Sequence, residues 1–262
     1  MPGRFANLEF HEERNGEETT RGGQTSALLD EHHYLAAAHE EYHWGRFEKA
    51  LRFYTRCLEQ NRAMVPAWVG QVQMLVQLGE YHEARLWSDK ALELFRDNGD
   101  LLAAKAQACV RLKDHAAAMV CSDGSMQAPG SSPWRWQARG EVLLARGREH
   151  FDACFRKSLD EPAADWFDRV VIARIYRHYR KASNALYYLR EAIQLEPACG
   201  YVWFEMGHCQ AALGLTGPAR SSYDRCLELR GDYGEAREAL AALDRMSFFT
   251  WLRRILRLRI GP

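Results

Sequence analysis

Apolar and polar positions along this chain recur at an interval of 34 residues. The pattern is clearest in GRFEKALRFYTRCLE from Gly45, GEYHEARLWSDKALE from Gly79 and GLTGPARSSYDRCLE from Gly214. In each stretch an alanine stands five positions after the glycine, and the stretch ends in a small residue, leucine and glutamate. The spacing predicts a helix, a turn at the glycine and a second helix in every period.

Six such periods can be aligned, with starts at Glu31, Val65, Gly99, Pro133, Trp166 and Gly200 and steps of 34, 34, 34, 33 and 34 residues. Three positions keep their character in most periods: a large residue at position four, a small one at position eight and an alanine at position twenty. Arg169 departs at position four of the fifth period, and the bulkier Val72 stands at position eight of the second. The large residues are Tyr34, Trp68, Leu102, Trp136 and Trp203; the small ones are Ala38, Ala106, Gly140, Ala173 and Gly207; the alanines are Ala50, Ala84, Ala118, Ala185 and Ala219.

This constellation resembles the tetratricopeptide repeat. The resemblance implies an all-α fold, a right-handed α-solenoid of about six helix-turn-helix repeats followed by a C-terminal capping helix. Small residues let neighbouring helices approach, and large residues fill the space beside them. Lys113 and Arg180 stand where the family has its turn glycine, and EHFDACFRKSLDEP in the fourth repeat fits only if one residue is dropped.

Four segments follow from the alignment. Residues 1–25 are glycine-containing, acidic and without periodicity, which predicts a flexible tail. Residues 26–233 form the repeat array, residues 234–246 the capping helix, and residues 247–262 a basic amphipathic helix.

Composition restricts the cellular compartment and the classes of partner that we expect. The 35 basic and 35 acidic side chains cancel, so no global field attracts nucleic acid, and none is expected as a partner. Seven cysteines without a C-x-x-C pair, no signal peptide and no long apolar run predict a cytoplasmic protein. The cysteines are expected to serve as small packing residues, and no cofactor is predicted.

The stretch HEEYH, residues 39–43, matches the H-E-x-x-H pattern of zinc proteases. Two histidines four residues apart share one face of a helix, but a catalytic zinc needs three protein ligands. Arg46 and Lys49 occupy the places of the further glycine and histidine of the extended motif. A zinc-dependent hydrolase is therefore the alternative hypothesis, and a non-enzymatic scaffold or adaptor is the leading one.

By the same resemblance, fixed positions of each first helix face a concave groove that binds a protein or peptide segment. The predicted groove residues are His39, Tyr42, His43, Gln73, Gln77, Gln107, Arg111, Arg174, Arg177, His178 and His208. Their amides and arginines suit the backbone carbonyls or acidic groups of a peptide.

One familiar role of such repeats can be examined directly. Co-chaperones that hold the acidic tails of heat-shock chaperones carry lysine, asparagine and arginine at fixed groove positions. Those positions hold Leu35, His39, Gln73, Ala103 and Gln107 here. Binding of heat-shock chaperone tails is not expected.

The C-terminal segment places apolar side chains opposite arginines, at Phe248, Phe249, Trp251, Leu252, Arg253, Arg254, Ile255 and Arg257. Such a helix is typical of peripheral attachment to an anionic membrane, which is the hypothesis adopted for it. Packing on the last repeat and contact with a partner are the alternatives.

Overall fold

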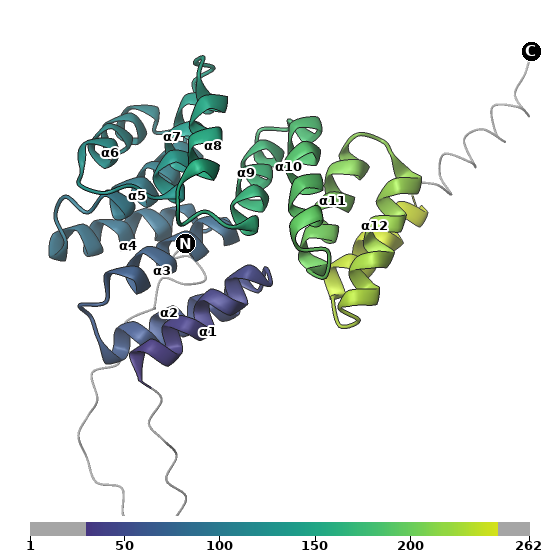
Figure 1. The fold of residues 1–262 in the computed structure, drawn as a ribbon, viewed down its shortest axis with the longest axis horizontal. Coiled ribbons are helices and arrows are strands. Elements are labelled where there is room, and N and C mark those ends of the chain that lie inside the picture. The colour runs from purple at the N-terminus through teal and green to yellow at the C-terminus, as the bar shows by residue number, and fades with distance from the viewer. Residues whose placement is uncertain (1–29, 246–262) are drawn as a thin grey trace, which may run out of the picture. The chain divides into compact units, whose positions relative to one another are not determined.

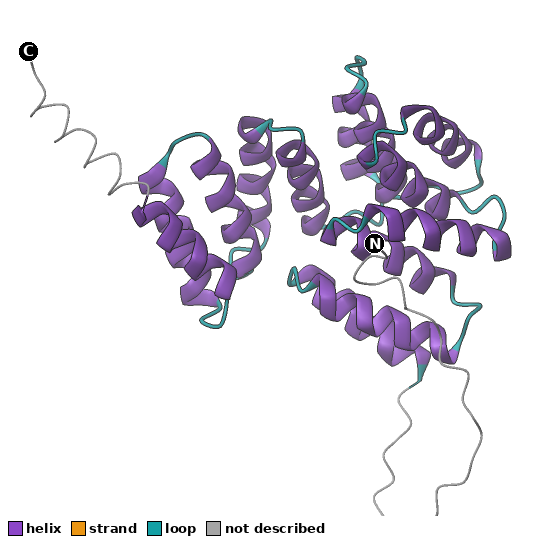
Figure 2. Ribbon diagram, turned by 180° about the vertical axis from the view of Figure 1, so that it is seen from behind, coloured by secondary structure: helices purple, strands orange, loops and turns teal. Residues whose placement is uncertain are grey.

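The computed structural model describes residues 30–245, and within this range the only regular secondary structure is helical. Twelve helices form six consecutive pairs (Figures 1 and 2). They are α1 (Glu31–His43), α2 (Phe47–Gln60), α3 (Val65–Leu78), α4 (Tyr81–Leu94), α5 (Gly99–Arg111), α6 (His115–Gln127), α7 (Pro133–Ala145), α8 (Phe151–Asp160), α9 (Trp166–His178), α10 (Ala182–Leu195), α11 (Gly200–Ala212) and α12 (Thr216–Leu229). A further helix covers residues 234–245.

The chain divides into two compact units between residues 163 and 164. In the first unit each of α1, α3, α5 and α7 packs on the helix that follows it and on the next of these four. In the second unit α9 and α11 are related in the same way, with α10 and α12 as their partners. We call α1, α3, α5, α7, α9 and α11 the first helices, and α2, α4, α6, α8, α10 and α12 the second helices.

All six turns within the pairs have a residue in the left-handed conformation, at steps of 34, 34, 34, 33 and 34 residues. These residues are Gly45, Gly79, Lys113, Gly147, Arg180 and Gly214, with φ between 57° and 85°. Each turn has the same two backbone hydrogen bonds; at Lys113, its own N–H donates to Val110 and the Asp114 N–H donates to Cys109, at 3.0 and 2.9 Å. This is the Schellman arrangement, and it forms at Lys113 and Arg180 although glycine is absent.

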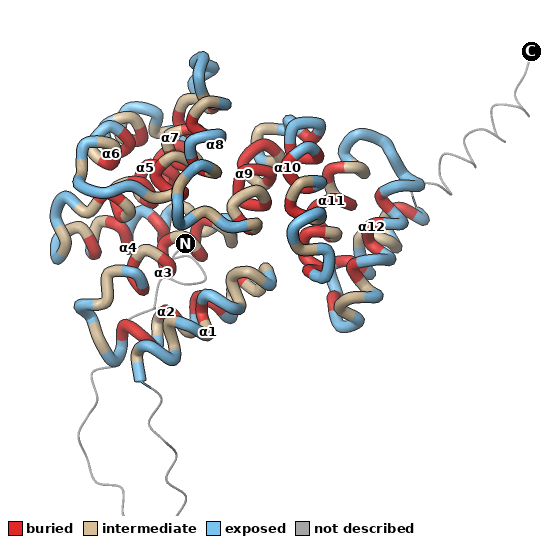
Figure 3. Tube along the Cα trace, in the orientation of Figure 1, coloured by how far each residue is buried: buried red, intermediate tan, exposed pale blue. Residues whose placement is uncertain are grey.

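The core is built from small residues on first helices and rings on second helices. A Cβ atom at Gly207 would lie 2.5 Å from the Tyr223 ring, and one at Gly140 would lie 2.5 Å from the Phe155 ring. Both rings are buried, as are the helix faces that meet inside each unit (Figure 3). Glycine is needed at these two positions because the helices approach so closely.

The fourth pair departs from the others at its second helix. The helix α8 begins at Phe151, four residues after Gly147, whereas the other second helices begin two residues after the turn residue. His150 has a φ of 72° and stands immediately before α8, which has only 10 residues. This extra turn explains the residue that the sequence alignment could not accommodate, and the division into units follows directly after this pair.

Two of the three junctions between repeats of the first unit have an ion pair at the same register. Lys105 on α5 meets Asp89 on α4 at 2.6 Å, and Arg139 on α7 meets Asp123 on α6 at 2.5 Å. Both partners are displaced by 34 residues from one pair to the next (105 to 139, and 89 to 123). In the second unit the equivalent first-helix position is Met206, which is buried and apolar.

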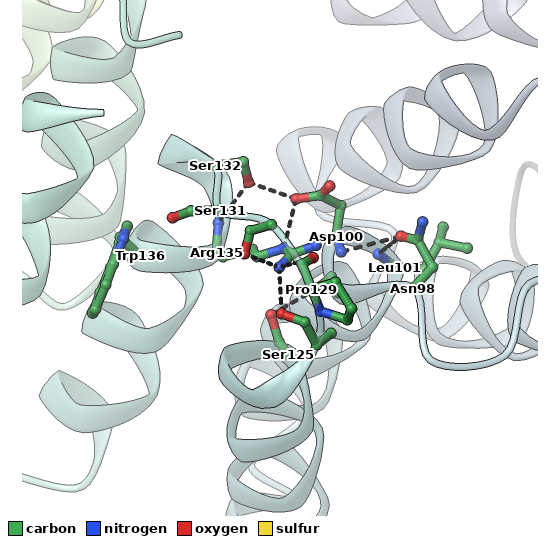
Figure 4. A network of polar contacts seen from close by, with 12 residues as sticks. Asn98, Asp100, Leu101, Ser125, Pro129, Ser131, Ser132, Arg135 and Trp136 are labelled. Atoms are coloured by element: carbon green, nitrogen blue, oxygen red, sulfur yellow. Dashed lines mark hydrogen bonds and ion pairs between the residues drawn. The ribbon is translucent and has the colours of Figure 1, made fainter. Parts of the chain in front are cut away.

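Arg135 fixes the junction between the third and fourth pairs (Figure 4). Its guanidinium donates to the carbonyls of residues 128, 129 and 130 and, through Nε, to Asp100 at 3.2 Å. It packs against Gly99, where an added Cβ would lie 2.1 Å from the Arg135 Cζ. Ser132 caps α7 and also donates to Asp100 at 2.5 Å. The loop before α7 is thus bound to the start of α5.

Candidate functional site in the first helices

The predicted groove residues all lie on first helices. His39, Tyr42, His43, Gln73, Gln77, Gln107 and Arg111 belong to the first unit, and Arg174, Arg177, His178 and His208 belong to the second. The structure therefore places these residues in two separate groups, each of which is described by itself.

The histidines of HEEYH lie on the last turns of α1. The His43 Nδ1 donates to the carbonyl oxygen of His39 at 2.8 Å, because a carbonyl can only accept. The His39 ring packs edge-on against Tyr54, at 5.9 Å between ring centroids. Burial, and secondarily the charge of His43, lower the pKa of His39. Across residues 30–245 the structure contains no group of three or more His, Cys, Asp or Glu side chains placed to hold a metal ion.

The first unit contains a buried carboxylate, Glu141 on α7. We call Glu141, Gln107, Arg111 and Tyr81 together the Glu141 cluster. The Gln107 Nε2 donates to Glu141 at 2.8 Å, and the Arg111 Nε forms an ion pair with the other carboxylate oxygen. Arg111 also donates to the Tyr81 hydroxyl at 3.3 Å. The Glu141 side chain is 0% exposed and that of Arg111 is 10% exposed. Two of the predicted groove residues are thus held by a carboxylate of the protein itself.

The second unit contains a corresponding group, the Glu205 cluster, formed by Glu205 and Tyr201 on α11 and by Arg174 and Arg177 on α9. Glu205 accepts from the Tyr201 hydroxyl at 2.5 Å and from Arg174, and its other oxygen lies 2.9 Å from the Arg177 Nε. Arg174 also donates to Tyr201. The side chains of Glu205, Arg174 and Arg177 are 2%, 16% and 38% exposed, respectively.

The charges within this cluster explain its protonation. Burial raises the pKa of Glu205, but Arg174, Arg177 and the Tyr201 hydroxyl more than offset this effect, so the pKa is lowered. Burial raises the pKa of Tyr201 well above its usual value. Near neutral pH the cluster therefore consists of one carboxylate, two guanidinium groups and a neutral phenol.

His208 lies one turn along α11 from Glu205. Its Nδ1 is 2.9 Å from the Tyr223 hydroxyl, and its ring packs edge-on against Phe204 at 4.3 Å between centroids. Burial lowers the pKa of His208, although Glu205 acts in the opposite direction. His208 is thus packed inside the second unit, whereas His178, at the end of α9, is exposed.

Glu205 is a member of the candidate site that the sequence analysis did not include among the predicted groove residues. A sequence signal did exist. The stretch GYVWFEMGHCQAA of α11 contains one carboxylate among predominantly apolar residues. A buried carboxylate requires a cationic partner, and α9 supplies two.

The predicted membrane or partner helix, from Phe248 to Arg257, lies outside the described residues and stays a prediction of the sequence. Of the helices between residues 30 and 245, none is both long and apolar enough to traverse a lipid bilayer.

The stacked pairs, the recurring turns and the small-to-large packing are the tetratricopeptide repeat fold, as the sequence predicted. A tetratricopeptide repeat protein from Parabacteroides merdae is similar at a TM-score of 0.51 and 15% identity, with 83% of this chain and 86% of that chain covered. The Cut9–Hcn1 hetero-tetramer of APC/C is similar at 0.50 and 15% identity, covering 83% and 44% of the two chains. The human IFIT1 dimer with m7Gppp-AAAA has a TM-score of 0.51 and 16% identity, covering 80% and 54%.

Among curated proteins, the CTR9 homolog of Arabidopsis thaliana is 30% identical over 114 residues, which are 43% of this chain and 10% of that protein. This chain therefore spans a small part of that relative, and less than half of the Cut9–Hcn1 chain. No family model matches the sequence. At these identities the solved structures show the fold alone.

Proposed function

We propose that this protein is a non-enzymatic scaffold that binds a protein segment along its first helices. The observation that supports this proposal most is that six tandem helix pairs occupy residues 31 to 229, which is most of the chain. The clusters of titratable groups on the first helices are ion pairs within the protein, around Glu141 and Glu205. Repeats of this kind present an extended surface, to which an extended or helical peptide can bind.

The surface of the first helices offers suitable groups for a peptide. Gln73 and Gln77 on α3 are half-buried, and each amide can both donate to a carbonyl and accept from an N–H. His43 at the end of α1 is also half-buried, and His178 at the end of α9 is exposed. Partly buried polar groups that are anchored on helices fix the orientation of a peptide backbone at low entropic cost.

Two of the similar solved structures are complexes of different kinds. One is a hetero-tetramer of protein chains, and the other contains m7Gppp-AAAA. Chains of similar fold thus occur in complexes of both kinds, and a test of function must distinguish a peptide from a nucleic acid. The cancelling charges of the chain favour a peptide.

The test is a selection of peptides from a random library, with a photo-crosslinker in each selected peptide. We expect the crosslinks to map to first helices, and we expect Gln73→Glu on α3 to weaken binding of peptides that crosslink there. The matched control is Gln60→Glu, the same change at an exposed position of the second helix α2. Failure to select any peptide, or crosslinks confined to second helices with equal binding by both variants, would contradict the proposed function.

A further inference from the structure

The buried carboxylates Glu141 and Glu205 both form ion pairs with arginines of the first helices. Glu141 forms an ion pair with Arg111, so one negative and one positive charge cancel. Glu205 forms ion pairs with Arg174 and Arg177, so one negative and two positive charges leave an excess of one. The Glu205 cluster thus contains two guanidinium groups and one carboxylate, whereas the Glu141 cluster contains one of each.

The excess charge lies where a ligand can reach it. Glu205 is 2% exposed and Arg174 is 16% exposed, whereas 38% of the Arg177 side chain is exposed. Arg177 thus has a part that contacts Glu205 and a part that faces solvent. A guanidinium group has five N–H donors in a rigid plane and can contact two carboxylates at once.

The end of α9 and the turn that follows it add further positive charge. Residues 174–181, RIYRHYRK, contain four arginine or lysine residues and one histidine, but no acidic residue. His178, Arg180 and Lys181 are all exposed. In the third repeat the corresponding stretch, QACVRLKD at residues 107–114, includes Asp114, which caps α6 and pairs with Arg85 at 3.5 Å.

We propose that Arg177 and the basic end of α9 bind a carboxylate of an acidic segment in the partner protein. The inference rests on the proposed function and specifies the chemistry of the partner. Glu205 already shows that the two guanidinium groups accept a carboxylate between them, and the excess positive charge attracts a second one.

An acidic peptide fits this surface better than a single-stranded RNA. Proteins that bind single strands stack bases on accessible aromatic rings. Three rings beside the cluster, Tyr176, Tyr201 and Phe204, are at most 5% exposed. Tyr179, within the basic segment, is half-buried and packs edge-on against His178. The surface thus offers several charges and hydrogen-bond donors but only a half-buried tyrosine ring and a histidine ring for stacking, which favours an acidic peptide.

The experiment compares three labelled probes by fluorescence anisotropy with the full chain: a peptide of alternating glutamate and serine, its glutamine counterpart, and a single-stranded RNA of similar length. We expect the acidic peptide to bind and the glutamine peptide to bind much more weakly. Arg177→Gln should reduce the affinity for the acidic peptide about fivefold, the upper range for one partly exposed ion pair.

The matched control is Arg190→Gln, which removes the same charge from an exposed position of α10 in the same unit. We expect this variant to bind as the wild type does, and circular dichroism of both variants shows whether they are folded. Equal losses in the two variants would indicate a general charge effect and overturn the inference. Preferential binding of RNA, or no difference between the acidic and glutamine peptides, would overturn it as well.

Failure here is distinguishable from failure of the proposed function. If library-selected peptides crosslink to first helices but are not acidic and bind Arg177→Gln unchanged, the scaffold function stands and the carboxylate inference is wrong. If no peptide is selected at all, the proposed function itself is wrong.

Discussion

The Glu141 and Glu205 clusters place the same kind of group, a buried carboxylate, on first helices of the two units. In the first unit the cluster is closed: Arg111 is 10% exposed, and Gln107 satisfies the second carboxylate oxygen. In the second unit the cluster is open, because two arginines share one carboxylate and Arg177 reaches solvent. An arginine at a predicted groove position is therefore not by itself available to a ligand.

The largest difference is expected when one arginine of each cluster is replaced. Arg111→Gln leaves Glu141, which is fully buried, without its guanidinium, and we expect a loss of about 3 kcal/mol in the free energy of unfolding. Arg177→Gln should cost less than about 1 kcal/mol, because Arg174 still pairs with Glu205 and Arg177 is partly solvated. Urea denaturation of both variants measures the difference, and equal losses would mean that the clusters are equivalent.

A somewhat smaller effect is expected when the second carboxylate is neutralised. Glu205→Gln leaves Arg174 and Arg177 close together without the carboxylate that they share, which we expect to cost about 2 kcal/mol of stability. The same change removes an internal competitor, so the affinity for the acidic peptide should rise. Anisotropy with the same labelled peptide checks this, with Glu141→Gln as the control that should leave the affinity unchanged. A fall in affinity with Glu205→Gln would show that Glu205 positions the arginines for the ligand.

Protonation of Glu205 at low pH should reproduce part of the loss of stability expected for Glu205→Gln. Because the pKa of Glu205 in the folded state is lowered, its stabilising contribution is complete above the ordinary value of 4.5 and is lost as the pH falls below it toward the folded value. The difference in unfolding free energy between wild type and Glu205→Gln should therefore shrink as the pH falls through this window. Urea titrations at neutral and acidic pH, repeated with His208→Asn to separate the nearby imidazole, give the comparison; a constant difference would contradict the assignment.

The smallest effects are expected at the turns. Lys113 and Arg180 have φ of 65° and 57°, a conformation that glycine adopts without a steric penalty. Lys113→Gly and Arg180→Gly should each stabilise the protein by about 0.5 to 1 kcal/mol, less the entropy that glycine adds to the unfolded chain. Arg180→Gly should also weaken the binding of the acidic peptide slightly, whereas Lys113→Gly should leave that binding unchanged. Thermal unfolding and anisotropy of the two variants provide the test.

Much of the fold could be predicted from the sequence because the repeat leaves a periodic record. The positions of Trp68, Ala106 and Gly207 follow from close helix packing, which restricts the size of every side chain there. The turns at Lys113 and Arg180 were harder to predict, since their conformation is imposed by the hydrogen bonds of the flanking helices and not by the residue itself. The displaced start of α8 depends on the extra turn at His150, and this turn has no recognisable pattern in the sequence.

The candidate site could be predicted only in part. The pattern located Arg174 and Arg177 on one face of α9, but it could not show that α11 supplies Glu205 to neutralise one of them. Pairing between neighbouring repeats depends on side-chain reach across two helices, which a single-helix pattern does not contain. Arg135 was missed for the same reason, since its partners belong to α5 and to the loop before α7.

The ion pairs at one register have a consequence for how the repeats assemble in the correct order. Lys105–Asp89 and Arg139–Asp123 have the same polarity and the same spacing, so neither pair distinguishes its own neighbour from the next one along. A folding chain in which α7 packed on α4, skipping a repeat, could still form such a pair, and misassembly of this kind is a characteristic failure of repeat proteins. The contact of Arg135 with Gly99 and Asp100 is specific to one neighbour, because only the third repeat begins with this glycine and aspartate. Arg135 therefore favours packing of the fourth repeat on the third repeat over packing on another repeat of similar sequence.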